Sequence, residues 1–227
     1  MTQPNTFIFA DDYDAHAAAV MDRYQHGDLR VFRQWVQGYV AADVRVECRV
    51  LYSSKGNPAI RALAHRMDEN GFFATQGGDD VIDVYSLSPY DLGPAVAGVA
   101  ALTKPGGREE IQIPGELLPR AWTEAERPDD AEPFSVRVQA VSPATTTIKA
   151  SAFTATATVQ SHWLPVRSWG FDHGKNAAVW VTVENDGDYI CRPGTNGATP
   201  MTKRLLTSRI DELIAEDVAS LREVLGR

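Results

Sequence analysis

Two separated stretches of the chain alternate between apolar and polar residues. In residues 44–52 the even-numbered positions are apolar, while Arg45, Glu47 and Arg49 fall between them. In residues 153–160, apolar positions alternate with threonines and a glutamine. Because successive side chains of a strand point to opposite faces, each stretch predicts a strand with one buried and one wet side.

One plan occurs twice along the chain. Residues 71–85 and 176–190 each read as strand, Gly/Asp turn, strand. Each is followed by a hydroxyl residue before proline, Ser88-Pro89 in the first and Thr199-Pro200 in the second, and then by an apolar helical segment. The first of these helices is expected to run to about Leu102. Hairpins followed by helices predict an α+β fold with a central, largely antiparallel sheet, flanking helices and duplicated sheet-plus-helix halves.

Two helices are predicted before the first strand. Asp11 and Asp12 are N-cap candidates for a helix through about Tyr24, and Asp28 is expected to cap a second one. After the first strand, a returning strand is expected at residues 59–66.

A single domain over residues 1–227 is expected. Its first half covers about residues 1–104, a connector about 105–150, and the second half about 151–227. Within the connector, residues 124–133 contain five acids and two prolines, a composition typical of a solvated spacer. Residues 165–171 are also expected to form a strand.

Charge and targeting signals limit the classes of partner. The chain has 30 acidic and 22 basic side chains and a net charge of −8, which argues against nonspecific binding to nucleic acid or to anionic lipid. The N-terminus lacks the basic and apolar regions of an export signal, and no apolar run reaches the roughly 20 residues of a membrane helix. These features predict a cytoplasmic protein that does not insert into membranes. Cys48 and Cys191 are expected to be reduced packing residues.

No motif for a nucleophile, a phosphate-binding loop or a zinc site is present, so neither a cofactor nor a metal is expected. The densest polar cluster includes His162, Asp172 and His173. An acid/base site there is one interpretation, but adjacent residues such as Asp172 and His173 cannot easily orient each other on a strand. A packed strand pair with a turn, or a protein-contact surface, explains the same residues.

Several segments resemble the EspG family of actinobacterial proteins associated with type VII secretion. They are residues 43–47, residues 84–92 leading into an Ala/Val helix, Arg167-Ser168-Trp169-Gly170, and Asp186-Gly187-Asp188-Tyr189 before the final helix. The resemblance extends from about Phe7 to the C-terminus. It implies quasi-two-fold α+β architecture and a non-enzymatic cytosolic chaperone, which binds the apolar helical tip of a PPE-type partner and keeps the PE–PPE pair soluble for secretion.

The resemblance also implies a partner-binding site. In EspG complexes the partner is held by the loop between the first two strands of the first half and by sheet residues of the second half. By position these correspond to Ser53, Ser54, Lys55, Gly56 and Asn57, together with Gln160, Arg167 and Trp169. Taken without the family, the loop is simply a polar hairpin connection.

Two alternatives to a chaperone stay open. One is an α+β enzyme with a site near His162 and His173, and the other is a self-associating structural module. EspG proteins usually begin with an additional strand and helix ahead of the segment that corresponds to Phe7, so the sheet is expected to lack an edge strand. Such an edge would allow a homodimer to form by strand pairing.

Overall fold

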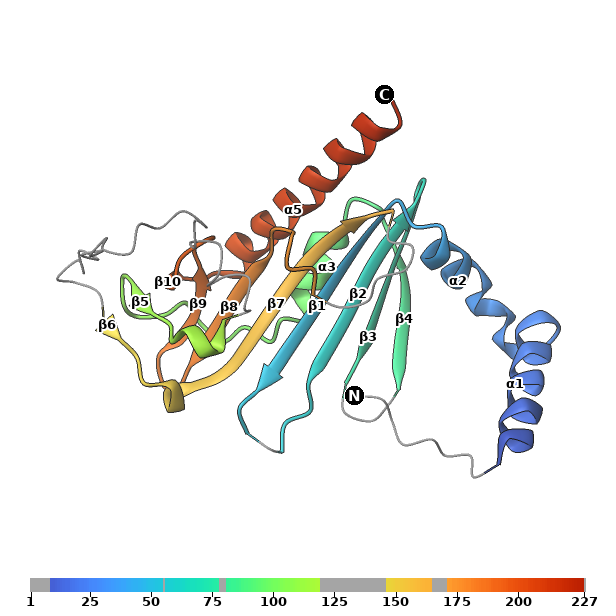
Figure 1. Cartoon of the computed structure of the whole chain (residues 1–227), viewed down its shortest axis with the longest axis horizontal. Coiled ribbons are helices and arrows are strands. Elements are labelled where there is room, and N and C mark those ends of the chain that lie inside the picture. Colours follow the sequence, from blue (N-terminus) through green and yellow to red (C-terminus); the bar gives the residue numbers. More distant parts are fainter. Residues whose placement is uncertain (1–8, 55, 78–80, 119–145, 165–170, 227) are drawn as a thin grey trace, which may run out of the picture.

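The computed structural model describes residues 9–54, 56–77, 81–118, 146–164 and 171–226. Their strands form one ten-stranded sheet in the order β4-β3-β2-β1-β7-β8-β9-β10-β5-β6 (Figure 1). Neighbours are antiparallel except β5 and β6, which are parallel. The strands are β1 (Val44–Tyr52), β2 (Ile60–Met67), β3 (Asn70–Gln76), β4 (Ile82–Leu87), β5 (Ile111–Gln112), β6 (Thr146–Thr147), β7 (Phe153–Trp163), β8 (Ala178–Val183), β9 (Gly187–Cys191) and β10 (Gly197–Pro200). The predicted α+β class with a largely antiparallel sheet is confirmed.

The two predicted alternating strands pair with each other at the centre of the sheet. All of β1 lies against β7, from Val44 opposite Trp163 to Tyr52 opposite Ala155. From this pair each half runs outward as a four-stranded meander, β1 to β4 on one side and β7 to β10 on the other, and each meander leads to a helix. These helices are α3 (Leu92–Gly98) and α5 (Lys203–Val224). The duplicated halves thus meet as an antiparallel pair.

The sequence repeat is displaced by one strand from this structural duplication. Residues 71–85 span β3 and β4, whereas residues 176–190 span β8 and β9, whose topological counterparts are β2 and β3. The cause is β10, where Thr199 pairs with Ile190 although it was expected to cap the last helix. Thr202 caps α5 instead, because its Oγ1 accepts a hydrogen bond from Leu205 N at 3.1 Å. Both threonines are suitable N-cap residues. Because Thr199 pairs with β9 as part of β10, the helix begins only after Thr202.

The helix α3 begins later and ends earlier than predicted. Ser88 forms a turn: its Oγ accepts from Tyr90 N at 3.2 Å and its carbonyl accepts from Asp91 N at 2.9 Å. The helix therefore starts at Leu92, and it ends at Gly98 instead of Leu102. A serine that bonds the amide two residues on favours a turn over a helix start.

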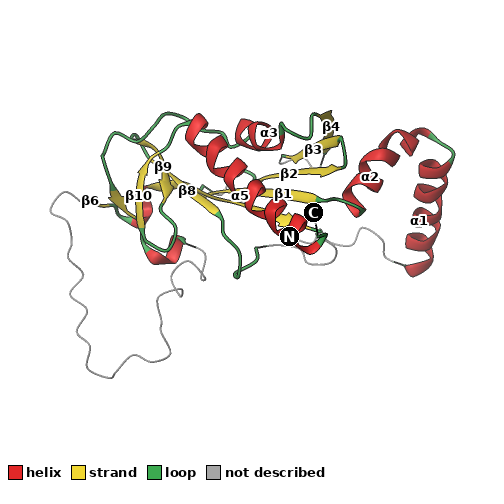
Figure 2. Cartoon of the chain, turned by 90° about the horizontal axis from the view of Figure 1, so that it is seen from above, coloured by secondary structure: helices red, strands yellow, loops and turns green. Residues whose placement is uncertain are grey.

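The N-terminal helical region is partly as predicted. The helix α1 (Ala10–Gln25) is confirmed, although Asp11 and Asp12 lie in its first turn and Phe9 is the N-cap residue. The second predicted helix divides into a 3-10 turn, η1 (Asp28–Phe32), and a short helix, α2 (Arg33–Val40). No side chain of α1 is buried, and Figures 1 and 2 show it standing apart from the sheet beyond α2.

The helices α3 and α5 pack side by side on one face of the sheet, here called the helix-covered face (Figure 2). Trp180, Leu206 and Ile210 are fully buried between sheet and helices, together with Val46 and Val96. The apolar helical segment predicted after Thr199-Pro200 supplies Leu206, Ile210 and Leu213, but Leu205 and Leu225 at its two ends are exposed. Burial of such side chains contributes about 1.5–3 kcal/mol each to folding.

The opposite side is called the open face: the face to which Arg45, Glu47, Arg49 and Leu51 of β1 point. Over the second half it is covered by a smaller core in which Ile111, Ile113 and Leu118 pack on the outer strands. The short strands β5 and β6 and the 3-10 turn η2 (Gly115–Leu117) lie within the range expected for the connector, and a second 3-10 turn, η3 (Ala150–Ala152), lies where the second half was expected to begin. The predicted spacer at residues 124–133 and the predicted strand at 165–171, apart from Phe171, lie outside the described residues.

A buried carboxylate holds this second half together. Asp188 is fully buried and accepts hydrogen bonds from Thr103 N at 2.6 Å, Thr103 Oγ1 at 3.1 Å and Thr182 Oγ1 at 2.7 Å. Its own backbone bonds the segment after α3 at Lys104 and Gly106. At Gly106 the ring of Tyr189 occupies the space that a Cβ would need. One residue thus joins the end of the first half to β8 and β9.

Over the first half, α2 covers the outer part of the open face. The ring centroids of its Trp35 and Tyr39 lie 5.7 and 5.6 Å from that of His65 on β2. On β3, the ring centroid of Phe72 lies 5.2 Å from that of His65. A Cβ at Gly38 would come within 2.9 Å of the Phe72 ring, so glycine lets the helix approach this closely.

The polar side of β1 is therefore not uniformly wet, contrary to the prediction. Arg45 is only 3% exposed, since α2 lies over it. Its Nη1 donates to Tyr39 Oη at 3.2 Å and its Nε forms an ion pair with Glu47 Oε1 at 2.8 Å. The exposed polar positions of β1 on the open face begin only at Arg49.

Removing the carboxylate of Asp188 is expected to destabilise the fold. Asp188→Ala should lower the free energy of unfolding by at least about 2 kcal/mol, because buried donors lose a charged acceptor. Urea denaturation measures this. Glu184→Ala in the same hairpin is the control, since Glu184 is exposed, and should change stability by less than about 0.5 kcal/mol. Equal effects of the two variants would contradict the assigned role.

His65 is expected to make stability depend on pH. Burial lowers the pKa of His65 from 6.5 to about 4. In the unfolded chain His65 takes up a proton near pH 6.5, whereas in the folded chain it stays neutral until about pH 4. The free energy of unfolding therefore falls as the pH drops from 6.5 toward 4. The loss from pH 7 to pH 5 should be about 2 kcal/mol. His65→Phe should lack this component in urea titrations at the two pH values; an unchanged pH dependence would contradict it.

Candidate functional site

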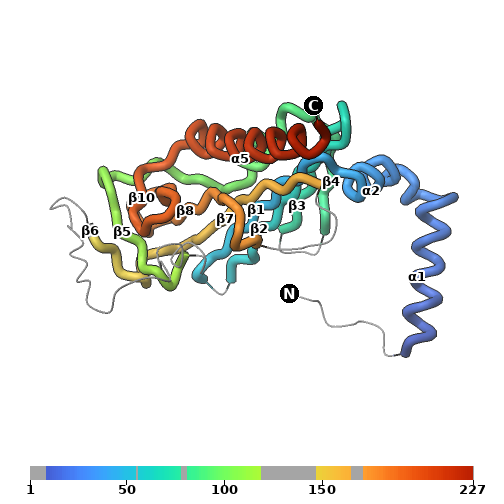
Figure 3. Tube along the Cα trace, turned by 45° about the horizontal axis from the view of Figure 1, so that its top comes forward, coloured from blue at the N-terminus to red at the C-terminus, as the bar shows by residue number. Residues whose placement is uncertain are grey.

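The centre of the open face is hollowed into a groove of about 950 Å³. Its floor is made by β7, β1, β2 and β3, so both halves of the sheet contribute. Trp35 and Tyr39 of α2 lie at one end, and Leu117 and Leu118 at the side of the smaller core. The groove lies on the face opposite α3 and α5, which pack on the helix-covered face, and Figure 3 shows α5 lying along that other side of the sheet.

Apolar side chains line much of the groove and are open to solvent. Leu51 of β1 is 40% exposed and Ile82 of β4 is 56% exposed. Leu63 and Phe171, both partly buried, add further apolar surface. An exposed apolar surface of this kind, bordered by polar groups, is typical of a site that binds another molecule.

The polar groups of the groove carry a local positive charge. Arg49 and Arg61 line it and are exposed, and they lie directly opposite each other in the β1–β2 register. Glu47 also lines the groove, but its carboxylate is paired with Arg45. Thr156 and Thr158 of β7 supply hydroxyl groups beside the arginines.

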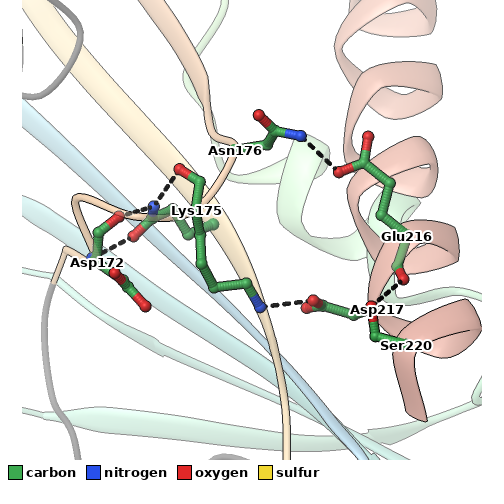
Figure 4. A network of polar contacts seen from close by, with 7 residues as sticks. Asp172, Lys175, Asn176, Glu216, Asp217 and Ser220 are labelled. Atoms are coloured by element: carbon green, nitrogen blue, oxygen red, sulfur yellow. Dashed lines mark hydrogen bonds and ion pairs between the residues drawn. The ribbon is translucent and has the colours of Figure 1, made fainter. Parts of the chain in front are cut away.

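Phe171 and His173 line the groove from the segment that precedes β8, and Gln160 holds this segment in place. Gln160 is 3% exposed. Its Nε2 donates to Asp172 O at 2.7 Å and to Lys175 O at 3.3 Å, and its Oε1 accepts from Asp172 N at 2.8 Å. Figure 4 shows these bonds around Asp172 and Lys175. The glutamine side chain therefore fixes the backbone that presents Phe171 and His173.

The same segment is tied to α5 from its other side (Figure 4). Lys175 Nζ lies 2.5 Å from Asp217 Oδ1, and Asp217 is only 4% exposed. Asn176 Nδ2 donates to Glu216 Oε2 at 2.8 Å. This part of the groove wall is thus connected to the helix on the opposite face.

The predicted hairpin loop lies at the end of the groove next to Leu51. Ser53 is tied to β7, because its N and its Oγ both donate to Thr154 O, at 3.0 and 3.3 Å. Asn57 N donates to Ser54 O at 3.3 Å, which closes the turn, and Gly56 is exposed. The loop therefore presents polar groups beside apolar Leu51.

The structure places the predicted site residues unevenly. Gln160 lies in the groove and the hairpin loop beside it, whereas Lys55, Arg167 and Trp169 lie outside the described residues. Sequence reasoning missed Arg61 and Ile82 as groove residues and did not single out Arg49 or Leu51. The alternation of β1 placed Arg49 on the polar face, but only the strand register brings Arg61 beside it.

The two histidines of the alternative enzyme site do not both line the groove. His173 lines the groove beside the ring of Phe171, whereas His162 is buried on β7 opposite Arg45. Burial, Lys175 and Arg45 lower the pKa of His162, and Asp217 and Asp172 oppose this. The Asp172 carboxylate accepts from Gly174 N at 2.9 Å. Among the described residues, no group of three or more His, Cys, Asp and Glu side chains is arranged to hold a metal.

Two further observations concern the cysteines and the membrane. Cys48 and Cys191 are buried and free, as predicted, and burial raises the pKa of both thiols to about 12. Their thiols are thus poor nucleophiles at neutral pH. Of the helices in the described ranges, none combines the length and apolar character needed to cross a bilayer.

Comparison with known proteins identifies the family. No curated protein matches the chain. The model of the EspG family matches residues 24–212, which is most of the 227 residues and includes every strand of the sheet. Most of α1 lies before the matched span. The chain belongs to the EspG family, a family of chaperones associated with type VII secretion.

Proposed function

We propose that this chain is a cytoplasmic export chaperone that holds the apolar helical tip of a PPE-type protein in the groove of the open face. By covering that tip it keeps a PE–PPE pair soluble until the pair is secreted. The observation that carries the proposal is a groove with exposed apolar residues on the face opposite α3 and α5, in a chain of the EspG family.

The groove has the properties needed to receive a helix end. Leu51, Ile82 and Phe171 provide separated apolar contacts, and an amphipathic helix binds a groove through side chains on one of its faces. Because α2 and the segment 171–176 are fixed to the body by packing and hydrogen bonds, the groove is largely formed before a partner arrives. A formed site loses less entropy on binding than a mobile one.

The hairpin loop completes the proposed site. Ser53, Ser54, Gly56 and Asn57 lie at the end of the groove and can give hydrogen bonds to the turn that follows a helix tip; Lys55 is assigned to the same contact from its sequence position. Gln160 acts by positioning Phe171 and His173, since its amide is occupied within the chain. Arg167 and Trp169 are proposed partner contacts on the resemblance alone.

Co-expression with PE–PPE pairs from the same genome tests the proposal. Size-exclusion chromatography should reveal a soluble complex of the three chains, and the pair should be less soluble without the chaperone. Leu51→Asp should weaken the complex by about 30-fold or more. The substitution removes an apolar contact worth about 2 kcal/mol and also places a charged group in the interface.

A matched control distinguishes binding from general destabilisation. Leu205 on α5 is 42% exposed, close to the 40% of Leu51, but lies on the other face. Leu205→Asp should leave the complex intact. The proposed function fails if no pair is made soluble by the chain, or if the two Asp variants bind equally well.

We also infer a second contact at the sheet edge. The edge strand β4 leaves Ile82 and Tyr85 more than half exposed. Pairing of β4 with a second copy would produce a homodimer. Light scattering on the purified chain should then give twice the mass of one chain, and Tyr85→Lys should shift it to the monomer. A monomer at all concentrations would remove this contact.

A further inference from the structure

We propose that Arg49 and Arg61 together bind a carboxylate on the helical partner, so that the client segment in the groove presents an Asp or Glu side chain among its apolar contacts. This inference rests on the proposed function and adds a requirement on the chemistry of the client.

The two arginines are adjacent by strand pairing. Arg49 of β1 is opposite Arg61 of β2, and directly paired residues have Cβ atoms about 4.5–5.5 Å apart. Thr158 is the partner of Arg49 on β7, and Gln76 is the partner of Arg61 on β3. All four residues line the groove. The two arginine side chains therefore start from neighbouring positions on its floor, within reach of one shared anionic group.

Neither guanidinium has a counter-charge within the described part of the chain, where no hydrogen bond or ion pair joins Arg49 or Arg61 to another side chain. The nearest carboxylate on the same face of β1 is Glu47, which is paired with Arg45 at 2.8 Å. Both arginines are exposed. The pair is therefore a concentrated positive charge in a protein whose net charge is −8.

This arrangement is unfavourable for folding by itself. Like charges directly opposite each other on neighbouring strands destabilise a sheet. The magnitude is similar to the stabilisation that a favourable cross-strand pair gives. A carboxylate placed between the two guanidinium groups would reverse the sign of the interaction. Guanidinium groups bind carboxylates through paired, charge-assisted hydrogen bonds. Binding of an anionic group would therefore remove the electrostatic repulsion between Arg49 and Arg61.

The groove restricts which anion fits. Leu51 and Leu63 flank the arginines on the same face, so an occupant must present apolar surface on either side of its negative charge. A helix with one acidic side chain between apolar ones meets this condition. A polyanion does not, because the overall negative charge of the chain opposes it.

Binding measurements on charge variants test the inference. The probe is the PE–PPE pair that forms a complex with the unaltered chain. Arg49→Gln with Arg61→Gln should weaken binding by about 10- to 100-fold, and the salt dependence of the affinity should become smaller. The thermal midpoint of the free chaperone should stay the same or rise, since a repulsion is removed. Arg204→Gln on α5, also exposed, is the control and should change neither quantity.

A charge exchange identifies the client residue. Arg49→Glu with Arg61→Glu should abolish the complex, and replacing one Asp or Glu on the client tip by Arg should restore it. Rescue by a single position supports the inference. If no Arg substitution at an acidic position of the client tip restores binding to the double Glu variant, the inference is overturned.

The remaining outcomes separate this inference from the proposed function. If Leu51→Asp abolishes binding while the double glutamine variant binds normally, the function stands and the carboxylate contact is wrong. If the double glutamine variant binds more tightly, the two arginines oppose the client and the inference is again wrong. If the unaltered chain binds no PE–PPE pair, both fail.

Discussion

The antiparallel pairing of β1 with β7 is the constraint on which the rest of the structure depends. It joins two four-stranded meanders into one sheet and relates them by an approximate two-fold axis. Because each meander ends in a helix that returns to the same side, α3 and α5 share one face, and in the described part of the chain the other face carries only the short helix α2 (Figure 2). The groove floor then comes from both halves, which no half could form alone.

The two halves are alike in plan but differ in what surrounds the groove. On the side of the first half, α2 packs through a cluster of aromatic rings around His65. On the side of the second half, a small core and the buried Asp188 fix the segment that follows α3. The clamp of Gln160 and Lys175 adds a third support. Binding surfaces gain precision when they rest on such packed and hydrogen-bonded supports.

Stability and binding place opposite demands on the open face. Exposed Leu51 and Ile82 contribute little to folding, and adjacent arginines oppose it. The helix-covered face, with Trp180, Leu206 and Ile210 fully buried, supplies the compensating stability. This division between a stabilising face and a binding face follows from the single-sided placement of the helices.

The sequence by itself determined the strands around the two alternating stretches, the α+β class and the buried cysteines, because these depend on local periodicity and composition. The family came from the resemblance of particular segments to known EspG proteins, which periodicity does not supply. The sequence did not determine where α5 begins, since Thr199 and Thr202 are equally good caps and only the pairing of β10 with β9 separates them. It also placed Arg45 in water, whereas α2 buries it. The proximity of Arg49 to Arg61, and of Gln160 to Lys175, was decided by the tertiary structure, because strand register and loop docking bring together residues whose separation along the chain carries no periodic signal.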